Sequence, residues 1–204
     1  MNAATRQLSN VDPVMAQLIT RFGAPELEPR RLPPFRALAQ AIVYQQLSGA
    51  AAGTILKRFR ALFPGKTFPK PAQVLQLDVD RLRTAGLSRP KARYLHDLAQ
   101  QTIDGVVPTL RECDRLTDAE LLERLTRILG VGRWTVEMLL IFNLGRPDVL
   151  PVHDLGVRRG FKIAYRKRTD PTPEQLDRWG GRWAPYRSTA AWYLWRAADG
   201  DEED

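Results

Sequence analysis

The chain has 204 residues, a length that suits one large domain or two small ones with a hydrophobic core. Lys and Arg total 31 against 23 Asp and Glu, which gives a net charge of +8, and 25 of the 31 basic residues are Arg. One cysteine excludes a disulfide framework and a four-cysteine zinc or iron–sulfur site, and two histidines leave little for a histidine-based metal site.

The basic excess concerns the partners of the protein rather than its fold. Nucleic acid is the first candidate partner, because Arg offers both charge and a planar fork for phosphate. The alternative is a solvated basic surface, and composition alone does not separate the two. No apolar run reaches membrane-spanning length and the first residues lack the apolar core of a signal peptide, so we expect a cytoplasmic protein without a membrane partner.

Apolar residues recur at helical spacing through nearly the whole chain, and no convincing pair of strands is found. Residues suited to N-caps precede several of these segments, at Ser48, Asp78, Ser88, Thr117 and Thr172. The sequence therefore predicts helices over residues 14–22, 35–46, 49–62, 71–75, 79–85, 89–103 and 118–125, and two more that begin at residue 173 and cover residues 190–195.

The most informative stretch is residues 125–139, which read LTRILGVGRWTVEML. Gly130 and Gly132 permit a tight turn and a close backbone approach by a large partner. A second helix begins directly after them, so its N–H groups and positive dipole end, together with Arg133, form an anion site that suits a DNA phosphate. An ordinary helix–turn–helix with a glycine cap is the alternative, and Gly-x-Gly alone favours it. The full string between two amphipathic helices is far more specific.

Four further strings accompany this hairpin: AIVYQQLS at 41–48, AGLSRPKA at 85–92, LGRPDVLPVHDLG at 144–156 and WAPYRS at 183–188. Together the five resemble the helix–hairpin–helix DNA glycosylases, and within them the 3-methyladenine DNA glycosylase II branch. The resemblance implies an all-α, two-lobed fold with DNA in the cleft between the lobes. We expect one lobe over residues 35–148 and a second that combines residues 1–34 with 149–204. The extra N-terminal β domain of longer members of the branch is not expected here.

The resemblance assigns catalysis to Asp154, which is also placed to cap the next helix. Cleavage of an N-glycosidic bond builds positive charge on the sugar, and a nearby carboxylate stabilises that charge or orients the attacking water. A helix N-terminus would in turn stabilise the negative charge of the carboxylate. Without the family match, a plain N-cap aspartate would be the preferred interpretation.

Trp134 stands where family members that also cut the strand carry a nucleophilic lysine. We therefore expect a monofunctional hydrolase that leaves an abasic site. In the alkylation-specific branch an aromatic residue at this position lines the base pocket, where an indole attracts positively charged alkylated purines. The pocket residues implied by the resemblance are Trp134, Trp195, Met138 and Tyr44, although Trp195 suits core packing equally well and Met138 replaces a tyrosine of the branch.

A flipped base leaves a hole in the duplex that a wedge side chain fills. The resemblance places the wedge in Gln45, Gln46 and Leu47, with Gln46 nearest to the family position. It assigns DNA contact to the hairpin residues Leu129, Gly130, Val131, Gly132 and Arg133. The backbone carbonyls of Thr126, Ile128 and Val131 match positions that hold a structural Na⁺ or K⁺ in family members, and no cofactor is required.

The expected function is base excision repair of alkylated bases, of the 3-methyladenine or 7-methylguanine type, in double-stranded DNA by a monomer. One alternative is a glycosylase for deaminated or mismatched bases such as uracil or hypoxanthine. The other is a non-catalytic helix–hairpin–helix DNA-binding protein, which would have no use for Asp154 at its matching position.

Overall fold

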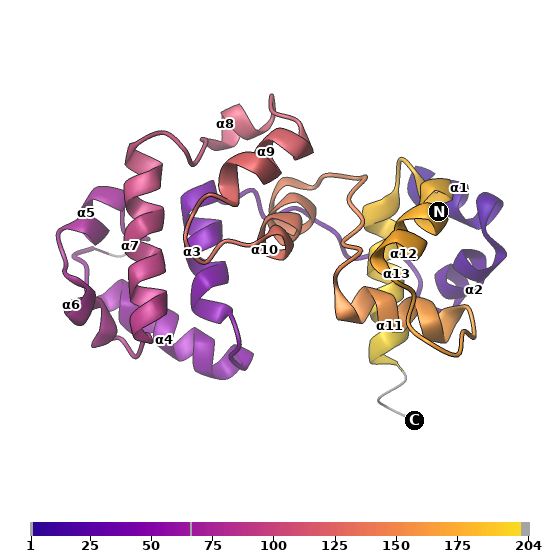
Figure 1. Ribbon diagram of the computed structural model, residues 1–204, viewed down its shortest axis with the longest axis horizontal. Helices are drawn as coiled ribbons and strands as arrows, with labels where there is room; N and C mark the ends of the chain where they lie inside the picture. The colour runs from indigo at the N-terminus through magenta and orange to yellow at the C-terminus, as the bar shows by residue number, and fades with distance from the viewer. Residues whose placement is uncertain (1, 66, 201–204) are drawn as a thin grey trace. The chain divides into compact units, whose positions relative to one another are not determined.

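The computed structural model describes residues 2–65 and 67–200, which contain helices and no strand, so the predicted all-α fold is confirmed. The chain forms two compact units (Figure 1). The inserted unit comprises residues 31–139, and the terminal unit joins the residues up to Arg30 to those from Leu140 onward. Within the described residues, no helix combines the length and apolarity that a membrane crossing demands.

The unit boundaries differ from the sequence-based ones, which lie after residues 34 and 148. The segment that follows Leu139 belongs with the C-terminal helices, because the ring of Phe142 packs 5.6 Å from that of Trp195. Arg30 is tied to the same segment through its backbone N–H, which donates to the Phe142 carbonyl at 3.0 Å.

The described helices of the inserted unit follow one another in chain order. They are α3 (Pro34–Tyr44), α4 (Gly49–Ala61), α5 (Pro71–Leu75), α6 (Val79–Arg83), α7 (Arg89–Ile103), α8 (Leu110–Cys113), α9 (Asp118–Leu125) and α10 (Arg133–Met138). Helix α7 is central and packs against α3, α5 and α6 (Figure 1). Its buried face carries Leu95 and Leu98, which share the unit's core with Ile42 of α3 and Leu82 of α6.

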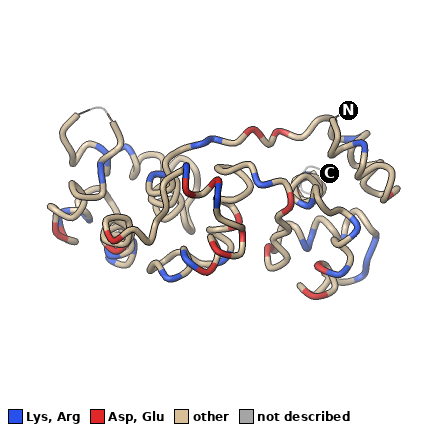
Figure 2. The backbone as a smooth tube through the Cα atoms, turned by 90° about the horizontal axis from the view of Figure 1, so that it is seen from above, with Lys and Arg blue, Asp and Glu red and all other residues tan. Residues whose placement is uncertain are grey.

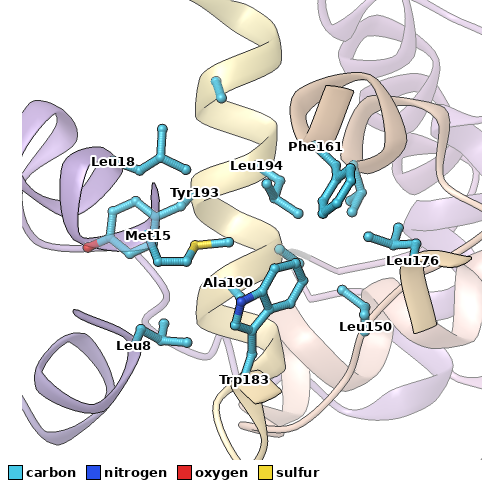
Figure 3. Close-up of a cluster of buried hydrophobic side chains, with 13 residues drawn as sticks. Leu8, Met15, Leu18, Leu150, Phe161, Leu176, Trp183, Ala190, Tyr193 and Leu194 are labelled. Carbon is cyan, nitrogen blue, oxygen red and sulfur yellow. The ribbon is translucent and has the colours of Figure 1, made fainter. Parts of the chain in front are cut away.

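The terminal unit is built around its last helix. Its elements are α1 (Ala3–Val11), α2 (Pro13–Phe22), the π-helix η1 (Leu139–Leu144, which starts at the unit boundary), α11 (Leu155–Ala164), α12 (Pro173–Gly180), the 3₁₀-helix η2 (Gly181–Trp183) and α13 (Arg187–Asp199). Figure 3 shows side chains from both sides of α13 meeting it, among them Met15, Phe161 and Trp183. Helix α11 packs so closely that a Cβ on Gly160 would lie 1.8 Å from the Leu194 carbonyl oxygen. Glycine is therefore required at this helix crossing.

The predicted caps are confirmed: Ser48, Asp78, Ser88, Thr117 and Thr172 each accept a hydrogen bond from a backbone N–H of the following first turn. Helix α3 ends two residues earlier than predicted, because Gln45 leaves the helical region with a ψ of 129°; Gln46 follows in a left-handed conformation with a φ of 56°. Helices α1 and α8 lie outside the predicted set. Figure 2 shows Lys and Arg spread along both units among acidic residues, so charge along the chain does not by itself mark a site.

Candidate active site

Asp154 is the N-cap of α11, as the sequence predicts. Its Oδ1 accepts a hydrogen bond from the Val157 backbone N–H at 2.8 Å and another from the Trp195 indole Nε1 at 2.9 Å. The carboxylate therefore lies at the positive end of a ten-residue helix with a fixed orientation. This arrangement suits a group that must present negative charge to a developing cation.

Trp195 comes from α13, 41 residues further along the chain. One face of its indole packs beside Phe142, at 5.6 Å between ring centroids. Gly156 provides room for the pair, since a Cβ there would lie 3.0 Å from Trp195 Cδ1 and 3.1 Å from Asp154 Oδ1. Sequence reasoning proposed Trp195 as a pocket wall and missed its bond to Asp154, because helical periodicity does not reveal which helices pair.

The loop before Asp154 is held to the start of α13. Arg187 forms a two-pronged ion pair with Asp148, with Nε–Oδ1 at 2.8 Å and Nη2–Oδ2 at 2.9 Å, and it lowers the pKa of that carboxyl. Ser188 Oγ accepts from the Val149 backbone N–H and donates to the Arg146 carbonyl. His153, the residue before Asp154, is exposed.

The hairpin between α9 and α10 turns sharply at Gly130, whose φ is +77°. A Cβ on Gly130 would lie 2.2 Å from the ring of Tyr94. The group that approaches this glycine closely is therefore the Tyr94 side chain and not an external partner. Gly132 instead has no heavy atom within 4 Å of its Cβ position and remains accessible to a large partner. The Leu129 side chain at the tip is 50% exposed.

Helix α10 carries the hairpin's charged and aromatic residues. Arg133 Nε donates to Oε1 of the buried Glu137 at 3.0 Å, one turn later. Trp134 is 50% exposed, and Met138 lies one turn beyond it and is half-buried. An exposed indole of this size is unusual in a folded protein, and it suits contact with a ligand.

The predicted wedge residues form the turn after α3. Gln45 directs its side chain inward and donates from Nε2 to the Gly130 carbonyl at 2.9 Å, whereas Gln46 and Leu47 are exposed. Tyr44 is 41% exposed, and its hydroxyl lies 3.7 Å from the Cβ position of Gly53 on α4. The turn therefore offers two outward-facing side chains, Gln46 and Leu47, above one glutamine that anchors it.

The predicted cation ligands in the hairpin are backbone carbonyl oxygens, which are a suitable donor type for Na⁺ or K⁺. Thr126 is the C-cap of α9 and Ile128 lies two residues beyond it, so both carbonyls follow the negative end of the helix dipole. The Ile128 carbonyl accepts from the Val131 N–H at 3.1 Å, which leaves it one lone pair for a further partner. Among the described residues, no cluster of His, Cys, Asp or Glu forms a metal site.

Of the residues predicted from sequence, Asp154 and Trp195 touch within the terminal unit. The hairpin, Trp134, Met138, Tyr44 and the Gln45–Leu47 turn all belong to the inserted unit, where Gln45 joins the turn to the hairpin.

Comparison with known proteins identifies the family of the chain. Residues 39–185 match the family model described as HhH-GPD superfamily base excision DNA repair protein. The chain belongs to this superfamily. It is 38% identical over 200 residues to DNA-3-methyladenine glycosylase 1 of Schizosaccharomyces pombe, a match that covers 97% of this chain and 88% of that protein.

Solved structures of two 3-methyladenine glycosylases are similar to this chain over nearly its whole length. The S. pombe 3-methyladenine DNA glycosylase in complex with abasic DNA superposes with a TM-score of 0.84, covering 96% of each chain. A DNA-3-methyladenine glycosidase of Bacillus halodurans is 34% identical with a TM-score of 0.89, covering 100% of this chain and 92% of that one.

Proposed function

We propose that the protein is a monofunctional DNA glycosylase of base excision repair that removes alkylated bases from double-stranded DNA and leaves an abasic site. The observation that carries the proposal is Asp154, held at the N-terminus of α11 by the Trp195 indole. The names of the S. pombe and B. halodurans relatives support the alkylated-base class, and the S. pombe complex with abasic DNA supports DNA as the partner.

The reaction is a hydrolysis at the sugar C1′. The bond between C1′ and the base nitrogen breaks, the electron pair leaves with the base, and a water oxygen bonds to C1′ while its proton is released. Asp154 stabilises the positive charge that develops on the sugar or orients the water. Trp134 carries no amine, so no Schiff base with the sugar is formed and the strand remains uncut.

We assign Trp134, Trp195, Met138 and Tyr44 to the base pocket. An exposed indole attracts a cationic purine such as 3-methyladenine or 7-methylguanine more strongly than a neutral base. Trp134→Leu should therefore reduce excision of 7-methylguanine more than excision of hypoxanthine or uracil. Equal losses on both classes would favour a glycosylase for deaminated bases.

We assign DNA-backbone contact to residues Leu129–Arg133 and the wedge to the exposed Gln46 and Leu47. The backbone carbonyls of Thr126, Ile128 and Val131 would hold a Na⁺ or K⁺, which would supply positive charge at the hairpin. We propose further that the protein acts as a monomer in the cytoplasm, together with the chromosomal DNA. Its affinity for duplex DNA should fall with added salt, as phosphate contacts require.

The test is single-turnover excision on a panel of duplexes that carry 3-methyladenine, 7-methylguanine, hypoxanthine or uracil. Asp154→Asn keeps an N-cap oxygen for Val157 and Trp195 but removes the charge. We expect about a 10²- to 10³-fold loss of excision with abasic-duplex binding retained. Asp177→Asn, an exposed carboxylate on α12, is the matched control.

Three outcomes would contradict the proposal. Excision by Asp154→Asn at the wild-type rate would overturn the catalytic assignment. A covalent protein–DNA adduct after borohydride treatment would contradict the monofunctional assignment. Duplex binding without excision of any base in the panel would identify a non-catalytic DNA-binding protein.

A further inference from the structure

Helix α7 presents a polar strip that contacts both turns assigned to DNA. Lys91, Tyr94 and Asp97 are spaced three residues apart, so they follow one another along one side of the helix. All three are half-buried, whereas Arg93 on the same helix is exposed. We call Lys91, Tyr94 and Asp97 the α7 strip.

Lys91 holds the end of α3. Its Nζ donates to the carbonyls of Val43, at 2.8 Å, and Gln45, at 2.5 Å. Carbonyls at a helix C-terminus lack intrahelical donors and attract cations, so the ammonium group satisfies two of them. The Lys91 side chain is half-buried, and this burial lowers its pKa. The next residue, Gln46, has a left-handed φ of 56° and forms the turn that ends in Leu47.

Tyr94 and Asp97 hold the hairpin. Asp97 Oδ2 accepts the Leu129 backbone N–H at 2.8 Å. The Tyr94 ring fills the space beside Gly130, where any Cβ would overlap it. The tip of the hairpin is therefore fixed on the same helix that fixes the end of α3.

The two turns are also joined directly, because Gln45 Nε2 donates to the Gly130 carbonyl at 2.9 Å. The backbone of Gln45 is thus held by Lys91, and its side chain holds the hairpin. A movement of either turn would break at least one of these hydrogen bonds.

We propose that the α7 strip and Gln45 are positioning residues that hold the wedge turn, Gln45–Leu47, and the hairpin, Leu129–Arg133, in one relative geometry. Binding of the DNA backbone by the hairpin and insertion of the wedge into the space of a flipped base then occur together. This inference rests on the proposed function. Lys91 contacts the wedge turn and not the hairpin, so its loss should loosen the wedge turn directly and the hairpin only through Gln45.

The main variant is Lys91→Met, which keeps the length of the side chain but removes the donor. We expect single-turnover excision of 7-methylguanine paired with cytosine to fall about tenfold or more, since small misplacements of positioning groups cost up to about a hundredfold. Binding of an abasic duplex should change less than about threefold, because that DNA has no base to unstack. Lys91→Arg restores a charged donor and should recover much of the rate. Arg93→Met is the matched control on the same helix.

Changing the base opposite the lesion separates a specific effect on base flipping from a general loss of structure, because a general loss would lower the excision rate equally with either opposite base. A mispaired lesion costs less to flip, so it depends less on the wedge. The ratio of the wild-type rate to the Lys91→Met rate should therefore shrink when the cytosine is replaced by thymine. An unchanged ratio, or a Lys91→Met rate equal to that of Arg93→Met, would overturn the proposal.

Amide hydrogen exchange tests the locking without enzymatic activity. In Lys91→Met, exchange should quicken at Gln46 and Leu47 and also at the hairpin residues Leu129 to Val131, relative to Arg93→Met. If Lys91→Met does not fold, Gln45→Ala breaks the direct link and should show the same effect at both turns. Unchanged exchange at the hairpin would overturn the locking. Absence of excision by the wild-type protein would instead count against the proposed function.

Discussion

The two units hold their candidate site residues by different means. In the terminal unit, the Trp195 indole and the Val157 backbone N–H both donate to Asp154, and the helices behind it meet through apolar side chains and Gly160. In the inserted unit, side chains of α7 and Gln45 bond to the backbone of two irregular turns. Contacts in the terminal unit should therefore act on bond cleavage through the carboxylate itself, and those in the inserted unit should act through the placement of the DNA and of the flipped base.

The largest effect is expected where the terminal unit is packed most closely. Gly160→Ala would place a methyl group 1.8 Å from the Leu194 carbonyl oxygen, so α11 and α13 must move apart. We expect the free energy of unfolding to fall by about 3 kcal/mol in a urea titration followed by tryptophan fluorescence. Gly181→Ala, in the same unit, has no atom within 4 Å of the new methyl group and is the control. Equal midpoints for the two variants would argue against this packing constraint.

A smaller but more selective effect is expected at Trp195. Trp195→Phe keeps a ring beside Phe142 and removes the N–H that donates to Asp154. Hydrogen bonds to charged groups contribute about 1.5–3 kcal/mol, so excision should slow by about tenfold or more while duplex affinity is kept. Trp192→Phe alters a tryptophan of the same helix that packs on Tyr193 instead. If the two variants cleave at the same rate, the indole does not orient the carboxylate.

In the inserted unit, two glycines of the hairpin should separate an effect on stability from an effect on DNA binding. Gly130→Ala combines a left-handed φ with an overlap on Tyr94 and should lower the free energy of unfolding by about 1–2 kcal/mol. Gly132→Ala has ordinary backbone angles and open space, so its melting temperature should match the wild type. Its affinity for undamaged duplex, measured by fluorescence anisotropy, should nevertheless fall. Wild-type affinity of Gly132→Ala would show that DNA does not approach this backbone.

The smallest effect concerns the loop before Asp154. Arg187 lowers the pKa of Asp148 below its ordinary 3.8, so their ion pair stabilises the folded state above about pH 4, and this contribution is lost as the pH falls through the lowered pKa. Arg187→Met should reduce the free energy of unfolding by about 1 kcal/mol at pH 7. The gap between wild type and variant should close below about pH 4. A gap that stayed constant across this range would contradict the assignment to the ion pair.

Local chemistry made much of the fold and part of the site predictable from sequence. N-caps such as Thr117, Ser88 and Asp154 act within one turn of helix, so short spacings reveal them. The hairpin was recognisable because its glycines and flanking helices are contiguous. The bond between Trp195 and Asp154 spans 41 residues and follows from how α11 and α13 pack, which periodicity does not encode.

The same limit applies to the α7 strip. Lys91 reaches carbonyls 46 and 48 residues away, and a lysine between Pro90 and Ala92 gives no sign of that role. The end of α3 was predicted two residues late because Gln46 is not a residue type that usually marks a left-handed turn. The chain leaves the helix at Gln45, whose carbonyl accepts from Lys91 and whose side chain donates to the Gly130 carbonyl.

The single cysteine of the chain has a practical value. Cys113 lies in the core of the inserted unit with no exposed surface, so thiol reagents should not reach it in the folded protein. A cysteine introduced at Leu47, which is 40% exposed, could therefore be labelled selectively without removing the natural thiol. A fluorophore placed there would report entry of the turn into a duplex in real time.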